Sequence, residues 1–252
     1  MIAIILAAGS GRRLNINKPK GLLNIGSYPL IQYSINNLIK TKEINKIYIV
    51  IGYEHIKYEN YFNSLNLGIE IETLYNPQFD SSGSMYSLYI AIQRIVGVND
   101  VSNNDFVILD SDIIYNYDEF YHYLINPFKN AVFATNVPPE RYDACYVKAN
   151  KEDLLEQISK NVNIVNSLNE HIIWEHIGII KTSAQTIYPM KEYCENIFER
   201  TSSLQHEYDD IFENLFFDYK VCKYENYIWA EVDDDIQLNH LITNVYPKLN
   251  LF

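Results

Sequence analysis

The first half of the chain alternates between short apolar runs and segments with helical periodicity. Residues 2–6 form a continuous apolar run, which is typical of a strand buried on both faces of a sheet. A helical pattern begins at Pro29, and its apolar side chains recur every three or four residues. The same alternation predicts further strands at residues 47–51, 69–74 and 106–109, and further helices at residues 54–64 and 84–95.

The second half is less regular. It predicts strands at residues 131–136, 144–149, 174–181 and 227–232, and helices at residues 183–199, 207–217 and 233–246. No repeat, low-complexity tract or linker separates the halves, so we expect one α/β domain over residues 1–252. Repeated strand–helix units predict a mostly parallel sheet with helices on both faces.

Polar residues gather where three predicted strands end. They occupy residues 9–20, 80–84 and 110–112. In open parallel sheets, ligands bind at the carboxyl ends of the strands. We therefore expect these three clusters to contribute to one ligand site.

Composition narrows the class of partner. The 252 residues are 48% hydrophobic and 21% charged, as in ordinary folded proteins, and the net charge is −12. That acidity argues against nucleic-acid or membrane-surface binding, which needs basic patches. The three cysteines form neither a CxxC pair nor a zinc pattern, and neither a signal peptide nor a transmembrane segment is recognisable. We expect a cytoplasmic protein with reduced thiols and with no nucleic-acid or membrane partner.

The loop after the first strand has the composition of a phosphate site. Its glycines allow close approach of the backbone to an anion, and four cations lie within nine residues, namely Arg12, Arg13, Lys18 and Lys20. The dinucleotide fingerprint is excluded because Leu14 stands where its third glycine belongs, and the P-loop pattern is absent. Composition alone also allows a solvated basic turn.

The order of residues in this loop is more informative. The stretch Leu6-Ala7-Ala8-Gly9-Ser10-Gly11-Arg12-Arg13-Leu14, followed by Lys18-Pro19-Lys20-Gly21-Leu22, resembles the signature of the sugar-nucleotide and choline-phosphate nucleotidyltransferase family. The resemblance implies a Rossmann-like mixed sheet of the glycosyltransferase-A type. Residues 1–125 would bind the nucleotide and residues 126–252 the acceptor. Residues 6–11 and Arg13 would hold the triphosphate, and Lys20 would neutralise charge on the α-phosphate, which makes Arg13 and Lys20 the candidate catalytic residues.

Two acidic motifs suggest a metal site. The strand at residues 106–109 runs into Asp110 and Asp112, which would face the same side of a regular strand. Mg²⁺ favours one or two carboxylates together with substrate phosphates. The stretch Trp229-Ala-Glu231-Val-Asp233 precedes the last helix, and Asp233 also suits the N-cap of that helix. The family closes with a similar stretch, although Gln237 replaces a usual acid. The resemblance therefore implies Asp112 and Asp233 as Mg²⁺ ligands, with Asp110 beside the nucleotide as an alternative ligand.

The third polar cluster bears on the nucleobase. In the family this loop meets the base, and the candidate contacts here are Ser82, Gly83, Ser84 and Ser87. The segment is similar to the cytidylyltransferase branch and lacks the Gln-x-x-x-x-G-x-A pattern of the thymidylyl and uridylyl branches. CTP is therefore favoured. A helix start capped by Ser82 or Ser84 is the simpler alternative.

Three further motifs concern the acceptor. The resemblance implies that Lys160, in Ile158-Ser159-Lys160, contacts the acceptor's phosphate. It places Glu175, Glu207, Tyr208 and Asp210 nearby, where tyrosine and carboxylates suit a cationic amine. The alternatives are an exposed lysine and acids that compensate a helix dipole. We expect His176 to be a packed strand residue.

The implied activity is the transfer of CMP from CTP to a small phosphorylated or phosphonate acceptor that carries an amine. Phosphocholine, 2-aminoethylphosphonate and L-glutamine phosphate are the candidates. The products would be pyrophosphate and a CDP-linked precursor for cell-surface or capsule polysaccharide. A sugar-1-phosphate nucleotidyltransferase that uses UTP, dTTP or GTP is the alternative function, and a homodimer stays open.

Overall fold

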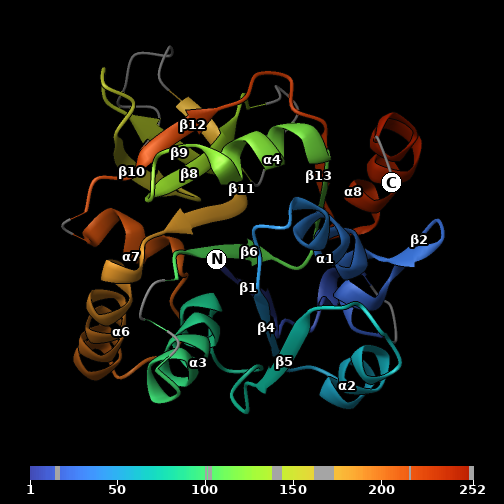
Figure 1. Cartoon of the computed structure of the whole chain (residues 1–252), viewed down its shortest axis with the longest axis horizontal. Helices are drawn as coiled ribbons and strands as arrows, with labels where there is room; N and C mark the ends of the chain where they lie inside the picture. The colour runs from blue at the N-terminus through green and yellow to red at the C-terminus, as the bar shows by residue number, and fades with distance from the viewer. Residues whose placement is uncertain are drawn as a thin grey trace.

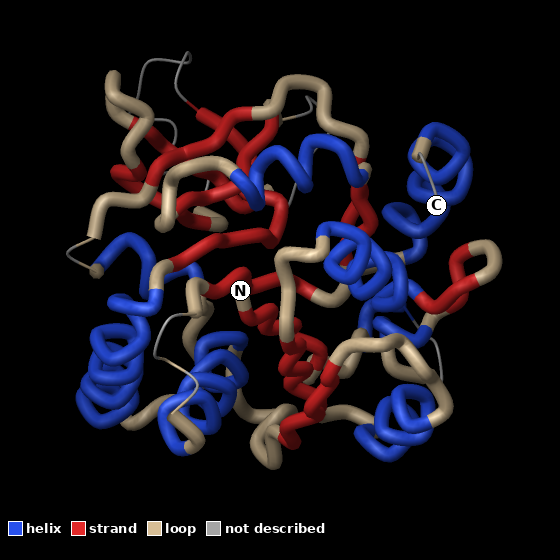
Figure 2. Tube along the Cα trace, in the orientation of Figure 1, coloured by secondary structure: helices blue, strands red, loops and turns tan. Residues whose placement is uncertain are grey.

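A nine-stranded mixed sheet forms the centre of the molecule (Figures 1 and 2). The structure is a computed structural model that describes residues 1–14, 18–99, 101, 104–137, 144–161, 173–215 and 217–249. The strand order is β10-β9-β11-β6-β1-β4-β5, and β8 pairs with both β11 and β12.

The first half of the chain builds the parallel part of the sheet. Its strands are β1 (Ile2–Ala7), β4 (Lys46–Ile51), β5 (Glu70–Tyr75) and β6 (Phe106–Asp110). Every residue of β1 is buried, as its unbroken apolar run predicts. In the register between β1 and β6, Leu6 lies beside Asp110, so the loop after β1 and the acidic end of β6 emerge at the same edge.

Helices cover both faces of this sheet. The helices α3 (Ser84–Gly97) and α6 (Ile187–Thr201) lie side by side and pack against Ile2, Ile4 and Leu6. On the other face, α1 (Leu30–Thr41), α2 (His55–Asn63) and α4 (Tyr117–Ile125) pack against Ala3, Ile5 and Ala7. Alternate residues of β1 thus pack into two hydrophobic cores, one on each face of the sheet. The predicted mixed sheet with helices on both faces is confirmed.

The second half extends the sheet through β11 (Ile173–Thr182), which runs antiparallel to β6. Around it lie β8 (Ala131–Thr135), β9 (Cys145–Ala149), β10 (Leu155–Ser159) and β12 (Lys220–Lys223). The sheet therefore changes from parallel to antiparallel pairing at β6 and β11, and the two halves of the chain meet along these two strands.

A small second sheet brings the end of the chain back to the end of β6. The strands β7 (Ile113–Tyr115) and β13 (Trp229–Glu231) pair antiparallel, with Glu231 opposite Ile113. The Val232 N–H donates to the Asp112 carbonyl over 2.9 Å. These hydrogen bonds join two acidic motifs that are far apart in the sequence.

The final helix differs from its prediction. The helix α8 (Asp235–His240) continues into a π-helical turn, Leu241–Val245, and a 3₁₀ turn, Tyr246–Lys248. Its N-cap is Asp234, whose carboxylate accepts from the Gln237 N–H over 2.9 Å. The predicted cap was Asp233, one residue earlier, and the Asp233 carboxylate faces the loop after β1 instead.

Most other differences concern short elements. The predicted helix at residues 207–217 shortens to α7 (Asp209–Asn214). The sequence pattern missed β10 and also the hairpin of β2 (Asn24–Ile25) and β3 (Tyr28–Pro29), β7 and β12. All of these except β10 have four residues or fewer, too few for a strand pattern to stand out. In the described ranges, no helix combines the length and the hydropathy needed to cross a bilayer.

Candidate active site

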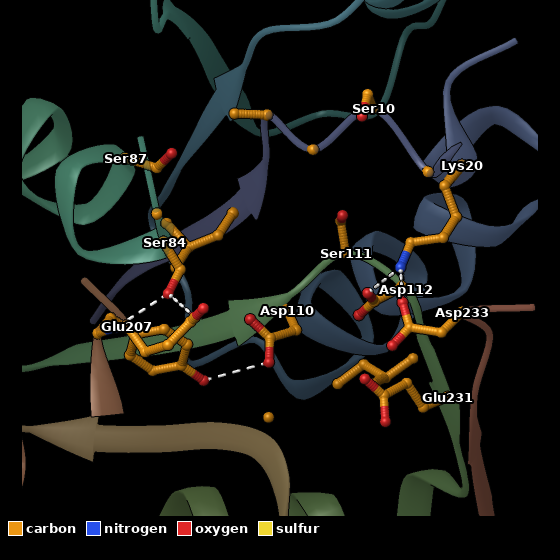
Figure 3. A pocket seen from close by; sticks show the side chains of 18 of the residues that line it. Ser10, Lys20, Ser84, Ser87, Asp110, Ser111, Asp112, Glu207, Glu231 and Asp233 are labelled. Atoms are coloured by element: carbon orange, nitrogen blue, oxygen red, sulfur yellow. Dashed lines mark hydrogen bonds and ion pairs between the residues drawn. The ribbon is translucent and has the colours of Figure 1, made fainter. Parts of the chain in front are cut away.

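A cavity of about 500 Å³ opens at the carboxyl ends of the parallel strands. Its wall combines all three predicted polar clusters with residues from β11, β13 and the start of α7. Figure 3 shows the central part of this wall. Three predicted site residues, Ala7, Glu175 and Asp210, do not line it: Ala7 and Glu175 are buried, and Asp210 is exposed.

The loop after β1 folds back over Lys20. Gly11 adopts a positive φ of 59°, and a Cβ at this position would lie 3.1 Å from the Lys20 Cβ. Glycine is therefore favoured here both by its conformation and by the close approach. Arg12 and Arg13 are exposed, whereas the Lys20 side chain is only 12% exposed and points into the cavity.

Lys20 joins the two predicted metal ligands. Its Nζ donates to Asp112 and, over 2.5 Å, to Asp233 Oδ1. Arg13 donates to the other oxygen of Asp233 over 2.6 Å. Burial acts to lower the pKa of Lys20, but the two carboxylates outweigh it and raise that pKa above its usual range. Lys20 therefore keeps its charge at any physiological pH.

Three carboxylates form a possible cation site. Oxygens of Asp112, Glu231 and Asp233 all lie within 4.8 Å of one another. The Asp112 Oδ1 is buried and accepts no hydrogen bond, although buried oxygens usually have a partner. Carboxylate oxygens are the donors that hard cations such as Mg²⁺ prefer, so these residues fit the predicted metal. Glu231 was not predicted as a ligand, but its spacing of two from Asp233 along an extended chain was a usable signal.

Asp110 lies apart from this group. The expectation that Asp110 and Asp112 face the same side is wrong, because β6 ends at Asp110 and the chain bends at Ser111 and Asp112. Asp110 accepts from the Tyr208 hydroxyl over 3.2 Å and lies between Glu207 and the pair formed by Asp112 and Lys20 (Figure 3). Burial and the Asp112 charge raise the pKa of Asp110 well above its usual range. Gly178, with a φ of 80°, makes room for it, since a Cβ there would lie 2.6 Å from Asp110 Oδ2.

His176 is held as a neutral, packed side chain. Its Nδ1 lies 3.4 Å from the Phe133 carbonyl, and its Nε2 lies 3.2 Å from the Tyr208 hydroxyl and 3.6 Å from Asp209 Oδ1. Burial lowers the pKa of His176 to about 4. The geometry therefore agrees with the expected packing role.

Asp209 is a cavity residue that the sequence motif did not single out. It is 6% exposed and approaches the Cys145 thiol, with 3.6 Å between Sγ and Oδ2. Burial raises the pKa of Asp209 to about 6. Asp209 stands on the cavity wall where Asp210, its exposed neighbour, was predicted.

Lys160 faces an acidic wall. Burial acts to lower its pKa, but Glu207, Asp209 and Asp110 together raise it above its usual range. This side of the cavity thus carries a lysine among several carboxylates.

The serines predicted to contact the nucleobase, Ser82, Ser84 and Ser87, have two different sets of hydrogen-bond partners. The buried Asn76 amide donates to the hydroxyls of Ser82 and Ser87, over 3.1 Å each. Ser84 instead donates to Glu207 Oε2 over 2.6 Å. The N-cap of α3 is Gly83, so the alternative in which Ser82 or Ser84 caps this helix is wrong.

Comparison with known proteins places this geometry in context. The family model described as the MobA-like NTP transferase domain matches residues 3–175. The choline-phosphate cytidylyltransferase of Streptococcus pneumoniae is 36% identical over 98 residues, which cover 38% of this chain and 41% of that protein. The bifunctional protein GlmU of Methanococcus vannielii is 26% identical over 264 residues, which cover 99% of this chain and 57% of that protein. This chain thus spans about half the length of these curated relatives.

A solved structure supports the fold over the full chain. The structure of CTP:phosphocholine cytidylyltransferase from Streptococcus pneumoniae (LicC) matches with a TM-score of 0.71 at 21% identity. The match covers 96% of this chain and 97% of the other. At this identity the likeness is evidence for the fold alone, and it agrees with the predicted nucleotidyltransferase-type α/β architecture.

The buried imidazole predicts how stability depends on pH. Between pH 6.5 and 4 the unfolded chain protonates His176 and the folded chain does not, so acidification lowers the free energy of unfolding. The contribution is roughly 3 kcal/mol. In urea unfolding from pH 7.5 to 4.5, His176→Asn should therefore lose less stability than the unaltered protein. Asp209 acts in the opposite direction between pH 6 and 3.8, but it does so in both proteins. Identical pH profiles would contradict the assignment.

Proposed function

Because this chain belongs to the MobA-like NTP transferase family, we propose that it is a cytidylyltransferase. It transfers CMP from CTP to a small phosphorylated or phosphonate acceptor that bears an amine, and it releases pyrophosphate. The observation that carries the proposal is the cavity itself, in which a glycine-rich basic loop, a buried lysine and a group of carboxylates converge. A phosphate-binding turn without catalytic function would not require that convergence.

The chemistry needs no general base from the protein. A phosphate oxygen of the acceptor is already ionised near pH 7, and it attacks the α-phosphorus in line with the departing pyrophosphate. Catalysis then consists of positioning and of neutralising charge. The backbone N–H groups of residues 9–11 and the Arg13 guanidinium bind the triphosphate. Lys20, held at the end of β6 by its contact with Asp112, offsets the charge that develops on the α-phosphate.

The carboxylates of Asp112, Glu231 and Asp233 are the residues that would hold Mg²⁺. The cation supplies charge neutralisation and orientation of the phosphates when it is bound. Lys20 and Arg13 already contact two of these carboxylates. Asp112 and Asp233 therefore have two roles: they position Lys20 and Arg13, and they would bind the cation.

The acceptor side supports an amine-bearing substrate. Asp110, Asp209 and Glu207 line it, and Asp209 Oδ1 is buried without a hydrogen-bond partner. A cationic amine beside them would favour the ionised forms of Asp110 and Asp209, whose pKa values burial raises, while Lys160 would contact the acceptor's phosphate or phosphonate. Phosphocholine, 2-aminoethylphosphonate and L-glutamine phosphate share this combination of charges. The product would be a cytoplasmic CDP-linked precursor for cell-surface or capsule polysaccharide.

The choice of CTP is supported by the 36% identical stretch shared with a choline-phosphate cytidylyltransferase. A panel of CTP, UTP, dTTP and GTP against the three amine-bearing acceptors and glucose 1-phosphate tests both substrates together. We expect pyrophosphate release to be greatest with CTP and one amine-bearing acceptor. Turnover of UTP or dTTP with the sugar phosphate would favour the alternative function, and no release with any pair would refute enzymatic activity.

Loss of the buried lysine should remove catalysis. We expect Lys20→Ala to lower kcat by roughly 10²–10³-fold, because one preorganised charge at the reacting phosphate is lost. Lys18→Ala is the matched control, since it removes one positive charge from the same loop, and it should cause a much smaller loss. Steady-state kinetics with circular dichroism as a folding check measures both. Equal losses in the two variants would mean that the loop acts only through its total charge.

Stimulation of turnover by Mg²⁺ should require the carboxylate of Asp112 but not that of Asp110. Asp112→Asn removes one of the three clustered carboxylates and should abolish Mg²⁺-stimulated turnover. Asp110→Asn should keep the Mg²⁺ requirement, because Asp110 faces Tyr208. Binding of Mn²⁺ in the presence of CTP, followed by electron paramagnetic resonance, gives a readout independent of turnover. Weak Mn²⁺ binding in Asp110→Asn with normal binding in Asp112→Asn would reverse the assignment.

A further inference from the structure

The first turn of α3 is satisfied by a distant stretch of backbone. The Gly83 N–H donates to the Leu204 carbonyl over 2.8 Å, and the Met85 N–H donates to the His206 carbonyl over 3.0 Å. Side chains usually satisfy such N–H groups at the start of a helix. We call residues 204–208, between α6 and α7, the docking segment.

Gly83 permits this close approach of two backbones. A Cβ at this position would lie 2.2 Å from the His206 carbonyl oxygen, well inside any tolerated contact. The neighbouring residue, Ser84, completes the connection. Its hydroxyl donates to Glu207 Oε2 over 2.6 Å and accepts from the Tyr208 N–H over 2.9 Å (Figure 3). One side chain thus fixes two consecutive residues of the docking segment.

The docking segment leads directly to the acidic side of the cavity. Glu207 and Tyr208 both line the cavity, and the Tyr208 hydroxyl donates to Asp110 Oδ2 over 3.2 Å. Asp209, the next residue, approaches both Cys145 and His176. The Ser84 hydroxyl is therefore connected through Glu207 and Tyr208 to the acidic side of the cavity.

The other serines of this loop are held differently. Ser82 and Ser87 both accept from the buried Asn76 amide, and Asn76 also accepts from the Gln78 N–H over 2.8 Å. These contacts stay within the nucleotide half of the chain. Ser84 is thus distinguished from Ser82 and Ser87 by hydrogen bonds that cross to the acceptor half.

We propose that Ser84 is a positioning residue for the acceptor and does not contact the nucleobase. Its hydroxyl sets the Glu207 carboxylate and the Tyr208 backbone, and through them the acidic wall that recognises the acceptor's amine. The inference rests on the proposed function, since it assigns a role at the same site. It also changes the role expected for Ser84, which the family resemblance placed with the base.

Three variants test this role. Ser84→Ala removes both hydrogen bonds to the docking segment, and Ser84→Thr keeps the hydroxyl. Ser81→Ala is the matched control, because the exposed Ser81 hydroxyl bonds only to Gln78 among the described residues. We expect Ser84→Ala to raise KM for the acceptor about ten-fold, as loss of a hydrogen bond to a charged group should. KM for CTP should change less than about two-fold, within ordinary mutational scatter, and Ser84→Thr should restore the acceptor KM.

Hydrogen exchange provides a second readout that does not depend on catalysis. Peptides that span the docking segment should exchange faster in Ser84→Ala than in the unaltered protein, because the Tyr208 N–H loses its acceptor. Ser84→Thr and Ser81→Ala should match the unaltered protein.

The experiments distinguish failure of the role proposed for Ser84 from failure of the proposed function. A rise in KM for CTP with an unchanged acceptor KM would place Ser84 at the base and overturn the inference, as would unchanged exchange in Ser84→Ala. If the unaltered protein transfers no cytidylyl group to any amine-bearing acceptor, the proposed function fails instead. That failure appears before any variant is compared.

Discussion

The site depends on the ammonium group of Lys20 between Asp112 and Asp233. Asp112, Glu231 and Asp233 place carboxylate oxygens within 4.8 Å of one another. Two unit charges 4 Å apart near a protein surface interact by about 4 kcal/mol, so this clustering is unfavourable without compensation. Lys20 and Arg13 provide it with contacts that span 92, 213 and 220 residues of sequence. The basic loop therefore compensates the acidic group electrostatically, in addition to the phosphate binding proposed for it.

This interaction also explains why the change of strand direction matters. The parallel half brings the loop after β1 next to the end of β6, and the antiparallel half brings β11 and the docking segment to the other side of the same strand end. Asp110 and Asp112, two residues apart, consequently face different partners: Tyr208 on one side and Lys20 on the other. Because β6 ends at Asp110 and the chain then bends, Asp110 and Asp112 contribute to different parts of the cavity wall.

Local patterns in the sequence predicted the parts of the site that are local in space. The apolar run of β1, the glycines after it and Lys20 lie in one segment, so their presence and order could be read from that segment, although Lys20 is held by the distant Asp112 and Asp233. The position of Glu231 depends on its pairing with β7, and those of Asp209 and Ser84 depend on the docking of residues 204–208. Such long-range contacts leave no periodic signal, and only Glu231, two residues before Asp233, could have been found from its spacing. The bend after Asp110 was missed for a related reason, since the motif is compatible with a continuing strand.

The resulting cavity is electrostatically divided. One end presents Lys20 and Arg13 beside the carboxylate group, which suits a triphosphate with its cation. The other end presents Asp110, Asp209 and Glu207 around Lys160, which suits a ligand with one anionic and one cationic group. Asp209 Oδ1 is buried without a hydrogen-bond partner among the described residues, and burial raises the pKa of this carboxyl to about 6. A cationic group bound beside Asp209 would stabilise its ionised form, and this is the physical basis on which we propose an amine-bearing acceptor.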